Sequence, residues 1–226
     1  MTEVAVLQQV PLFARVPAPD LAPLADRLIL RKFRAGQSVF HQGDEGTSLY
    51  VIKSGRVKIA LISDEGRELL VALLQEGDFF GELSLLDSHP RSATALALTD
   101  TETYVLTRED FLTFLRRSPE TALAVAGAIA ERLRQADERL AENAFLDLPQ
   151  RLGRCLLHLA ETNGRVSPDG IILDLPLSQR ELADLVGVTR QSVNKVLSQW
   201  ERAGVLRRRR GSLLLLRPAS LRHNPT

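Results

Sequence analysis

A charged stretch inside an otherwise apolar run is the sequence feature that most constrains the possible fold of this chain. Residues 80–94 read Phe-Gly-Glu-Leu-Ser-Leu-Leu-Asp-Ser-His-Pro-Arg-Ser-Ala-Thr, so Glu82, Arg91 and Ser92 lie close together within a segment typical of a sheet core. A buried arginine needs an anion to offset its lost hydration, and its planar fork matches a phosphate. Because the Glu82 carboxylate would repel that anion, we expect it to accept a hydrogen bond from a hydroxyl group. The stretch therefore predicts a pocket for a ligand with one phosphate charge and a sugar hydroxyl.

Short apolar runs separated by glycines surround this stretch. Alternating or apolar segments such as residues 48–52 and 57–62 lie between about Phe33 and Leu106. The glycines between them recur at the turn spacing of a sandwich or barrel: Gly36, Gly43, Gly46, Gly55, Gly66 and Gly77. We predict a β-roll, a double sheet whose interior holds one small ligand, preceded by two short helices at about residues 4–9 and 19–30.

A long helix is predicted from about Pro119 to Asn143. Proline suits the first turn of a helix, and Ser118 is a suitable N-cap. Apolar residues then alternate at spacings of four and three, which is typical of a coiled-coil seam. An amphipathic helix packed on its own domain is the alternative, but the flanking charges at 131, 132, 134, 138 and 139 favour a dimer. The predicted dimer interface consists of Ala122, Ala126, Ile129, Leu133, Ala136 and Leu140.

A second motif, residues 177–197, resembles a helix-turn-helix. Ser178 and Glu181 form a capping box, Gly187 provides the turn, and Thr189 caps the second helix. One face of the second helix is apolar, and the opposite face is rich in hydrogen-bonding groups and poor in acids, which suits the major groove. An ordinary surface helix pair is the alternative, but the capping residues, the turn glycine and the polar face all favour a DNA-binding motif. The apolar positions are Val193, Val196, Leu197 and Trp200, and the polar ones are Arg190, Gln191, Asn194, Lys195 and Ser198.

Strand pairs flank this motif. Residues around Val166 and 171–173 are predicted to pair through a turn at 167–170, after a helix from Asp147 to about Glu161. Four arginines, residues 207–210, lie between the apolar segments 205–206 and 213–216 and resemble the wing of a winged helix. As a group they are expected to contact phosphates without reading sequence. A solvated charged turn is the alternative for any single one.

Charge and composition narrow the class of protein. The net charge is +1, but residues from Asp147 onward hold 13 basic and 7 acidic side chains, against 16 and 21 before it. An acidic N-terminal part and a basic C-terminal part fit a sensor domain joined to a nucleic-acid-binding domain. The single cysteine, Cys155, excludes an internal disulfide framework and a four-cysteine iron–sulfur cluster within one chain. No nucleophile elbow, His-Glu-x-x-His motif, Walker loop or membrane-length apolar run is present, so we expect a cytoplasmic protein that is not an enzyme.

Over nearly its whole length the chain resembles the cyclic AMP receptor protein/fumarate-nitrate reductase regulator (CRP/FNR) family. The resemblance depends on three features in this order: residues 80–94, the long helix and the helix-turn-helix. The resemblance implies an α+β fold with a cyclic-nucleotide-binding β-roll at 1–117, a dimerisation helix at 118–144 and a winged helix-turn-helix at 145–226, with residues 144–147 at the hinge. It implies that Gly81 and Glu82 hold a ribose hydroxyl, and that Arg91 and Ser92 hold a cyclic phosphate near a short helix that begins at about Glu82. The remaining ligand contacts that it implies are Ile59, Val71, Leu74 and Leu83.

The family pattern changes at the base end of this site. Cyclic AMP-responsive members carry a hydroxyl pair on the dimer helix, and here the matching positions hold Ala136 and Asp137. Asp137 could accept a hydrogen bond from an adenine amino group. In the second motif the family's positions imply DNA base contacts by Arg190, Gln191, Asn194 and Lys195, with guanine favoured by the two basic residues. The implied phosphate contacts are Ser178, Gln179, Thr189, Ser192, Arg208, Arg209 and Arg210.

We therefore expect a homodimeric transcription regulator that binds an inverted-repeat operator under control of a cyclic nucleotide, cyclic AMP first, and that uses no metal or membrane. A contact with RNA polymerase is implied by the resemblance alone. Three alternatives stay open: a nucleotide-independent regulator in which Arg91 pairs with Glu82, a haem sensor, and a nucleotide-binding module that regulates a protein partner. The four histidines show no paired spacing for haem ligation.

Overall fold

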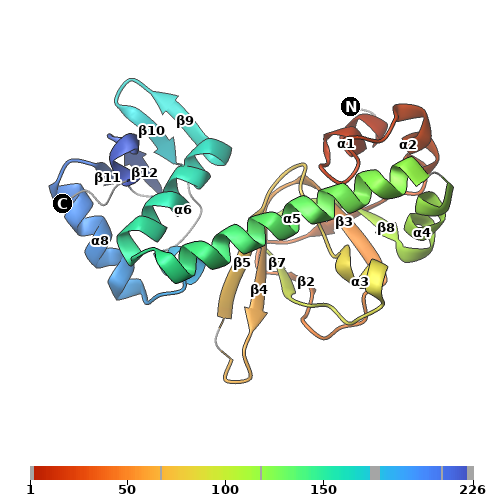
Figure 1. Cartoon of the computed structure of the whole chain (residues 1–226), viewed down its shortest axis with the longest axis horizontal. Coiled ribbons are helices and arrows are strands. Elements are labelled where there is room, and N and C mark those ends of the chain that lie inside the picture. The colour runs from red at the N-terminus through yellow and green to blue at the C-terminus, as the bar shows by residue number, and fades with distance from the viewer. Residues whose placement is uncertain (1–2, 67, 118, 174–178, 210, 223–226) are drawn as a thin grey trace. The chain divides into compact units, whose positions relative to one another are not determined.

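The computed structural model describes residues 3–66, 68–117, 119–173, 179–209 and 211–222. Helices and strands both contribute, which confirms the predicted α+β class (Figure 1). The chain divides into two compact units, residues 1–135 and 136–226. The division falls inside the long helix α5 (Pro119–Phe145).

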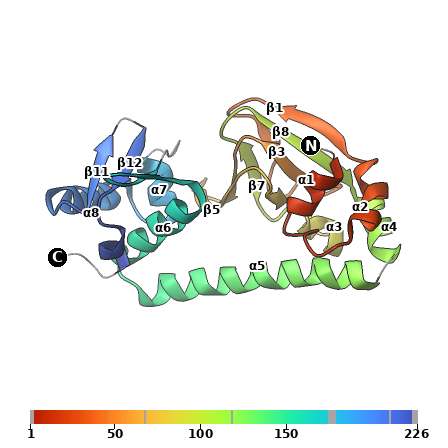
Figure 2. The same ribbon diagram turned by 90° about the horizontal axis from the view of Figure 1, so that it is seen from above.

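The first unit contains the predicted β-roll, built from two four-stranded antiparallel sheets (Figure 2). The first sheet has the order β1-β8-β3-β6, and its strands are Ile29–Phe33, Thr101–Thr107, Ser48–Ser54 and Phe79–Phe80. The second has the order β2-β7-β4-β5, with strands Ser38–Phe40, Thr94–Ala97, Val57–Ile62 and Glu68–Leu74. The arginine-containing segment predicted from the sequence thus lies between β6 and β7, one strand from each sheet.

Aromatic and β-branched side chains, which favour strands, fill the interior of the roll. Tyr50 and Phe80 stack with their ring centroids 5.1 Å apart, and Ile52 and Val57 are fully buried. The turn between β3 and β4 depends on Gly55, whose φ is +95° and whose Cβ, if present, would lie 2.6 Å from a backbone carbonyl oxygen. Only glycine fits this position without strain.

Three helices gather at one end of the roll: α1 (Glu3–Gln9), α2 (Ala18–Ala25) and α4 (Arg108–Arg117) (Figures 1 and 2). The second is shorter than the predicted helix at 19–30, because β1 begins at Ile29 and pairs with β8, with Leu30 opposite Tyr104. Helix α4 was absent from the sequence prediction. Its Phe111 and Phe114 pack edge-on against Phe13 and close this end of the core.

Helix α5 extends to Phe145, so the predicted hinge segment 144–147 is helical in its first half. Within the first unit, Val125 is buried in the core, and Ala124, Ala128 and Ile129 pack against it. Ile129 therefore contacts its own domain, although the heptad pattern placed it in the dimer seam. Three leucines of α5 are largely exposed: Leu123 at 73%, Leu133 at 63% and Leu140 at 67%.

The second unit is a winged helix. Its helices are α6 (Leu148–Asn163), α7 (Gln179–Leu185), α8 (Arg190–Arg202) and a final 3₁₀ turn at Pro218–Arg222. One antiparallel sheet has the order β11-β12-β10-β9, with strands Leu206–Arg209, Ser212–Leu215, Gly170–Leu173 and Gly164–Ser167. Asp147 and Gln150 form a capping box at the start of α6. The predicted strand pairs and helix-turn-helix are thus confirmed, while Ser178 lies outside the described residues.

Candidate ligand site and nucleic-acid interface

Arg91 is the buried centre of the candidate ligand site, with only 4% of its surface exposed. Its Nη1 donates to the carbonyl oxygen of Gly81 at 2.7 Å, and its Nη2 donates to the carbonyl oxygen of Ser48 at 2.7 Å. Its backbone is bonded to the loop after β2, donating to the Asp44 carbonyl at 2.8 Å. These hydrogen bonds position the Arg91 side chain and its backbone.

Aromatic rings cover the Arg91 guanidinium. Its Cζ lies 4.2 Å from the centroid of the Phe40 ring and 5.9 Å from that of Tyr50, within the range of a cation–π contact. Burial lowers the pKa of this guanidinium from its ordinary value, but arginine stays protonated in proteins. The charge therefore stays buried and lacks a salt bridge within the described residues. An anion at this site would relieve the desolvation cost.

The Nε of Arg91 is buried and has no hydrogen-bond partner in the described part of the chain. A buried donor without a partner costs roughly 1–3 kcal/mol, so this atom is a direct sign of a missing acceptor. An acceptor oxygen with negative charge satisfies both the donor and the charge. The residues present therefore fit a phosphate group.

Gly81 allows the chain to pass close to Arg91. Its φ is +84°, and a Cβ at this position would lie 2.7 Å from Arg91 Nη1 and 3.1 Å from the Ser48 carbonyl oxygen. Glycine is therefore required both for the conformation and for the space. The following helix, α3 (Leu83–Asp87), confirms the short helix that was expected near Glu82.

Glu82 is also buried, with 3% of its surface exposed, and its partner was missed by the sequence analysis. Its Oε1 accepts a hydrogen bond from Nη1 of Arg132 on α5 at 2.8 Å. Arg132 also lies over the ring of Phe79, 5.3 Å from its centroid. The alternative in which Arg91 pairs with Glu82 is not what the structure shows. In the heptad pattern Arg132 was only a flanking charge, and no local signal connects it to a residue 50 positions earlier.

The other expected ligand contacts differ in exposure. Ile59 is buried and Leu74 is partly buried, whereas Val71 and Leu83 are 39% and 46% exposed. Ser92 is exposed beside Arg91, and Ala136 and Asp137 are exposed on the part of α5 that belongs to the second unit. The structure thus brings Gly81, Glu82 and Arg91 together in one place.

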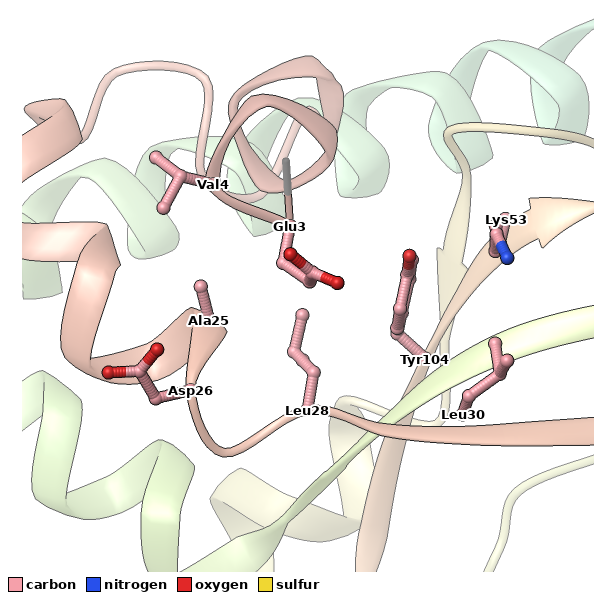
Figure 3. A pocket seen from close by; sticks show the side chains of 8 residues that line it. All are labelled: Glu3, Val4, Ala25, Asp26, Leu28, Leu30, Lys53 and Tyr104. Atoms are coloured by element: carbon pink, nitrogen blue, oxygen red, sulfur yellow. The ribbon is translucent and has the colours of Figure 1, made fainter. Parts of the chain in front are cut away.

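A pocket of about 590 Å³ lies elsewhere in the first unit. Figure 3 shows Glu3, Leu28 and Tyr104 around it, with Lys53 at its edge. The Lys53 ammonium is paired with Glu102 at 3.0 Å, so this pocket offers no free cation comparable to Arg91.

In the second unit, the predicted reading face of α8 is exposed. Val193, Val196, Leu197 and Trp200 are buried, as predicted, and the side chain of Thr189 accepts a hydrogen bond from the backbone of Ser192 as the N-cap. Gly187 adopts φ +67° in the turn. The four expected base-contact residues lie at the surface: Arg190, Gln191 and Lys195 are exposed, and Asn194 is partly exposed.

The wing arginines are not equivalent. Arg209 is exposed, Arg210 lies outside the described residues, and Arg208 is half-buried in an ion pair with Glu201. Gln179, another expected phosphate contact, lies near Arg190, whose Nε donates to its side-chain oxygen at 3.4 Å.

The chain matches two family models, a cyclic nucleotide-binding domain at residues 30–118 and a Crp-like helix-turn-helix domain at residues 150–223. A CRP-like cAMP-activated global transcriptional regulator of Mycobacterium tuberculosis is 33% identical over 93% of this chain and 94% of its own. A cyclic AMP receptor protein of Thermus thermophilus is 38% identical over 84% of this chain and 85% of its own. The solved structure of the c-di-GMP responsive global regulator CLP of Xanthomonas campestris superposes with a TM-score of 0.77 at 27% identity, over 88% of this chain and 99% of its own.

The architecture and these matches define a transcription regulator that joins a cyclic-nucleotide-binding domain to a helix-turn-helix domain. The chain belongs to the CRP/FNR family, as the sequence motifs predicted. In the described part of the chain, no helix has the length and apolar character needed to cross a membrane. No cluster of three or more potential metal ligands occurs among these residues either.

Proposed function

We propose that this protein is a homodimeric regulator whose DNA binding is controlled by a cyclic nucleotide, with cyclic AMP as the ligand. The observation that carries the ligand proposal is the buried Arg91, whose Nε lacks a partner while its other nitrogens are fixed by two backbone carbonyls. The names of the relatives from Mycobacterium tuberculosis and Thermus thermophilus support cyclic AMP.

The chemistry of the site follows from the described contacts. Arg91 neutralises the cyclic phosphate, and Ser92 adds a hydroxyl donor from the same loop. The Glu82 carboxylate accepts a hydrogen bond from the ribose hydroxyl while it also binds Arg132. Because Arg132 belongs to α5, ligand contact with Glu82 acts on the helix that carries the proposed dimer interface. Ile59 and Leu74 contribute apolar surface for the base.

A titration of the purified protein with cyclic AMP, cyclic GMP and c-di-GMP tests the ligand. We expect cyclic AMP and cyclic GMP to bind more tightly than c-di-GMP, because the site fits one phosphate and one ribose. Cyclic AMP is expected to bind most tightly of the three because the names of the two relatives point to it. The absence of the family's hydroxyl pair at Ala136 and Asp137 weakens discrimination between bases. If none of the three nucleotides binds below about 1 mM, the ligand proposal is wrong.

The proposed operator is an inverted repeat whose halves are read by two α8 helices about one DNA turn, roughly 34 Å, apart. A gel shift on genomic fragments with and without cyclic AMP tests this proposal. The same assay separates it from a nucleotide-binding module that acts only on a protein partner, since such a module leaves all fragments unshifted. RNA polymerase is the partner proposed from family membership, and its recruitment to a shifted fragment can be measured in the same assay.

A further inference from the structure

The wing arginine Arg208 is bound to helix α8. Its backbone N–H donates to Glu201 Oε1 at 3.0 Å, and its Nε donates to Oε2 at 2.8 Å. Its Nη2 lies 2.7 Å from the same Oε2 and donates to the Ser198 hydroxyl at 3.2 Å. Residue 208 thus engages both oxygens of one carboxylate and a hydroxyl one helical turn away. The hydrogen bonds from its backbone and side chain hold the pKa of Glu201 below its ordinary value.

The neighbouring arginines of β11 have a different environment. Side chains alternate between the two faces of a strand, and here Leu206 is buried and Arg208 half-buried, whereas Arg207 and Arg209 are exposed. Their backbones pair with β12, but within the described residues the side chains of Arg207 and Arg209 form no hydrogen bond or salt bridge. They are therefore available to an external anion, while the planar fork of Arg208 is already occupied.

We propose that Arg208 and Glu201 form a brace that positions the wing against α8, and that Arg207 and Arg209 supply the phosphate contacts of strand β11. This inference rests on the proposed DNA binding and assigns Arg208 a positioning role in place of the phosphate contact expected from the sequence. Contacts from the backbone N–H and the guanidinium of one residue to both oxygens of a single carboxylate fix geometry as well as charge. Without it the wing is free to move, and its phosphate contacts weaken.

Neutralising Glu201 should change DNA affinity in opposite directions, depending on whether Glu201 acts only through its charge or positions the wing. A carboxylate in a DNA-binding unit repels the phosphate backbone, so its removal strengthens binding if only charge matters. If Glu201 holds the wing in place, Glu201→Gln weakens binding instead. Asp169→Asn is the matched control, because Asp169 is an exposed carboxylate in the β9–β10 turn of the same unit.

The experiment measures DNA affinity of the full-length protein by fluorescence anisotropy over a series of salt concentrations, after thermal melting has shown that each variant is folded. We expect Glu201→Gln to weaken binding about five-fold and Asp169→Asn to leave it unchanged or strengthen it. The double variant Glu201→Gln/Arg208→Gln should bind no more weakly than Arg208→Gln alone, because both changes remove one brace. Arg207→Gln and Arg209→Gln should each reduce the slope of log affinity against log salt by about 0.9.

Binding by Glu201→Gln that equals or exceeds that of the wild type would overturn the brace. An additive loss in the double variant would overturn it too, because independent effects would then belong to two separate sites. The failure of the proposed function is distinct: wild-type protein would then bind no DNA fragment at any salt concentration, whereas the brace fails only in variants of a protein that binds.

Discussion

At the scale of single residues, the surroundings of Arg91 predict how its replacement changes cyclic-nucleotide affinity. It lies in a site where its charge has no anion and its Nε no acceptor among the described residues. Replacing Arg91 with Gln should weaken cyclic-nucleotide binding at least about 30-fold, or roughly 2 kcal/mol, because a buried phosphate then loses its charged partner. Arg31→Gln, an exposed arginine on β1, is the control and should leave affinity unchanged. Isothermal titration gives both values, and equal affinities would remove Arg91 from the site.

The Glu82–Arg132 pair gives a second prediction at this scale. Arg132→Met leaves the nearly buried Glu82 carboxylate without its cation, and we expect a loss of about 1–2 kcal/mol in the free energy of unfolding, discounted because Arg132 is 37% exposed. Arg134→Met, which breaks the exposed pair with Glu131 on the same helix, should cost less than about 0.5 kcal/mol. Urea unfolding distinguishes them. Adding Glu82→Gln to Arg132→Met should recover part of the loss, and no recovery would mean that the pair is not the cause.

At the scale of elements, the sequence predicted those whose signals are local. Turn glycines, periodic apolar runs and capping residues identified the β-roll, the long helix and the winged helix before the structure was known. The C-terminal end of α2 and the role of Arg132 depend on contacts between residues distant in sequence, such as the pairing of Leu30 with Tyr104. The binding of Arg208 to Glu201 likewise depends on how β11 meets α8. Helix α4 was missed because its two buried phenylalanines stand among charged residues.

The exposed leucines of helix α5 lead to a prediction about association. Leu133 and Leu140, one heptad apart, are both largely exposed in the single chain, and so much exposed leucine on one helix favours burial against a second copy. Leu133→Lys should convert the proposed dimer to a monomer in analytical ultracentrifugation. Ile29→Lys, at a 50% exposed position on β1, is the control and should keep the dimer. A wild-type monomer at micromolar concentration would contradict the proposed interface.

At the scale of the whole molecule, the proposed nucleotide site and the proposed DNA-reading helix lie in different units, so control of one by the other would be a coupling free energy. A nucleotide changes DNA affinity only by the difference in its own affinity for the two states, and shifting a population from 1:99 to 99:1 needs about 5.5 kcal/mol. Reciprocity then gives a strict test. If cyclic AMP tightens operator binding by some factor, a saturating operator duplex must tighten cyclic AMP binding by the same factor. Two titrations measure these numbers, with Arg91→Gln as the variant that should lose both effects together. If Arg91→Gln kept the full cyclic AMP-dependent change in DNA affinity, the controlling ligand site would lie outside the roll.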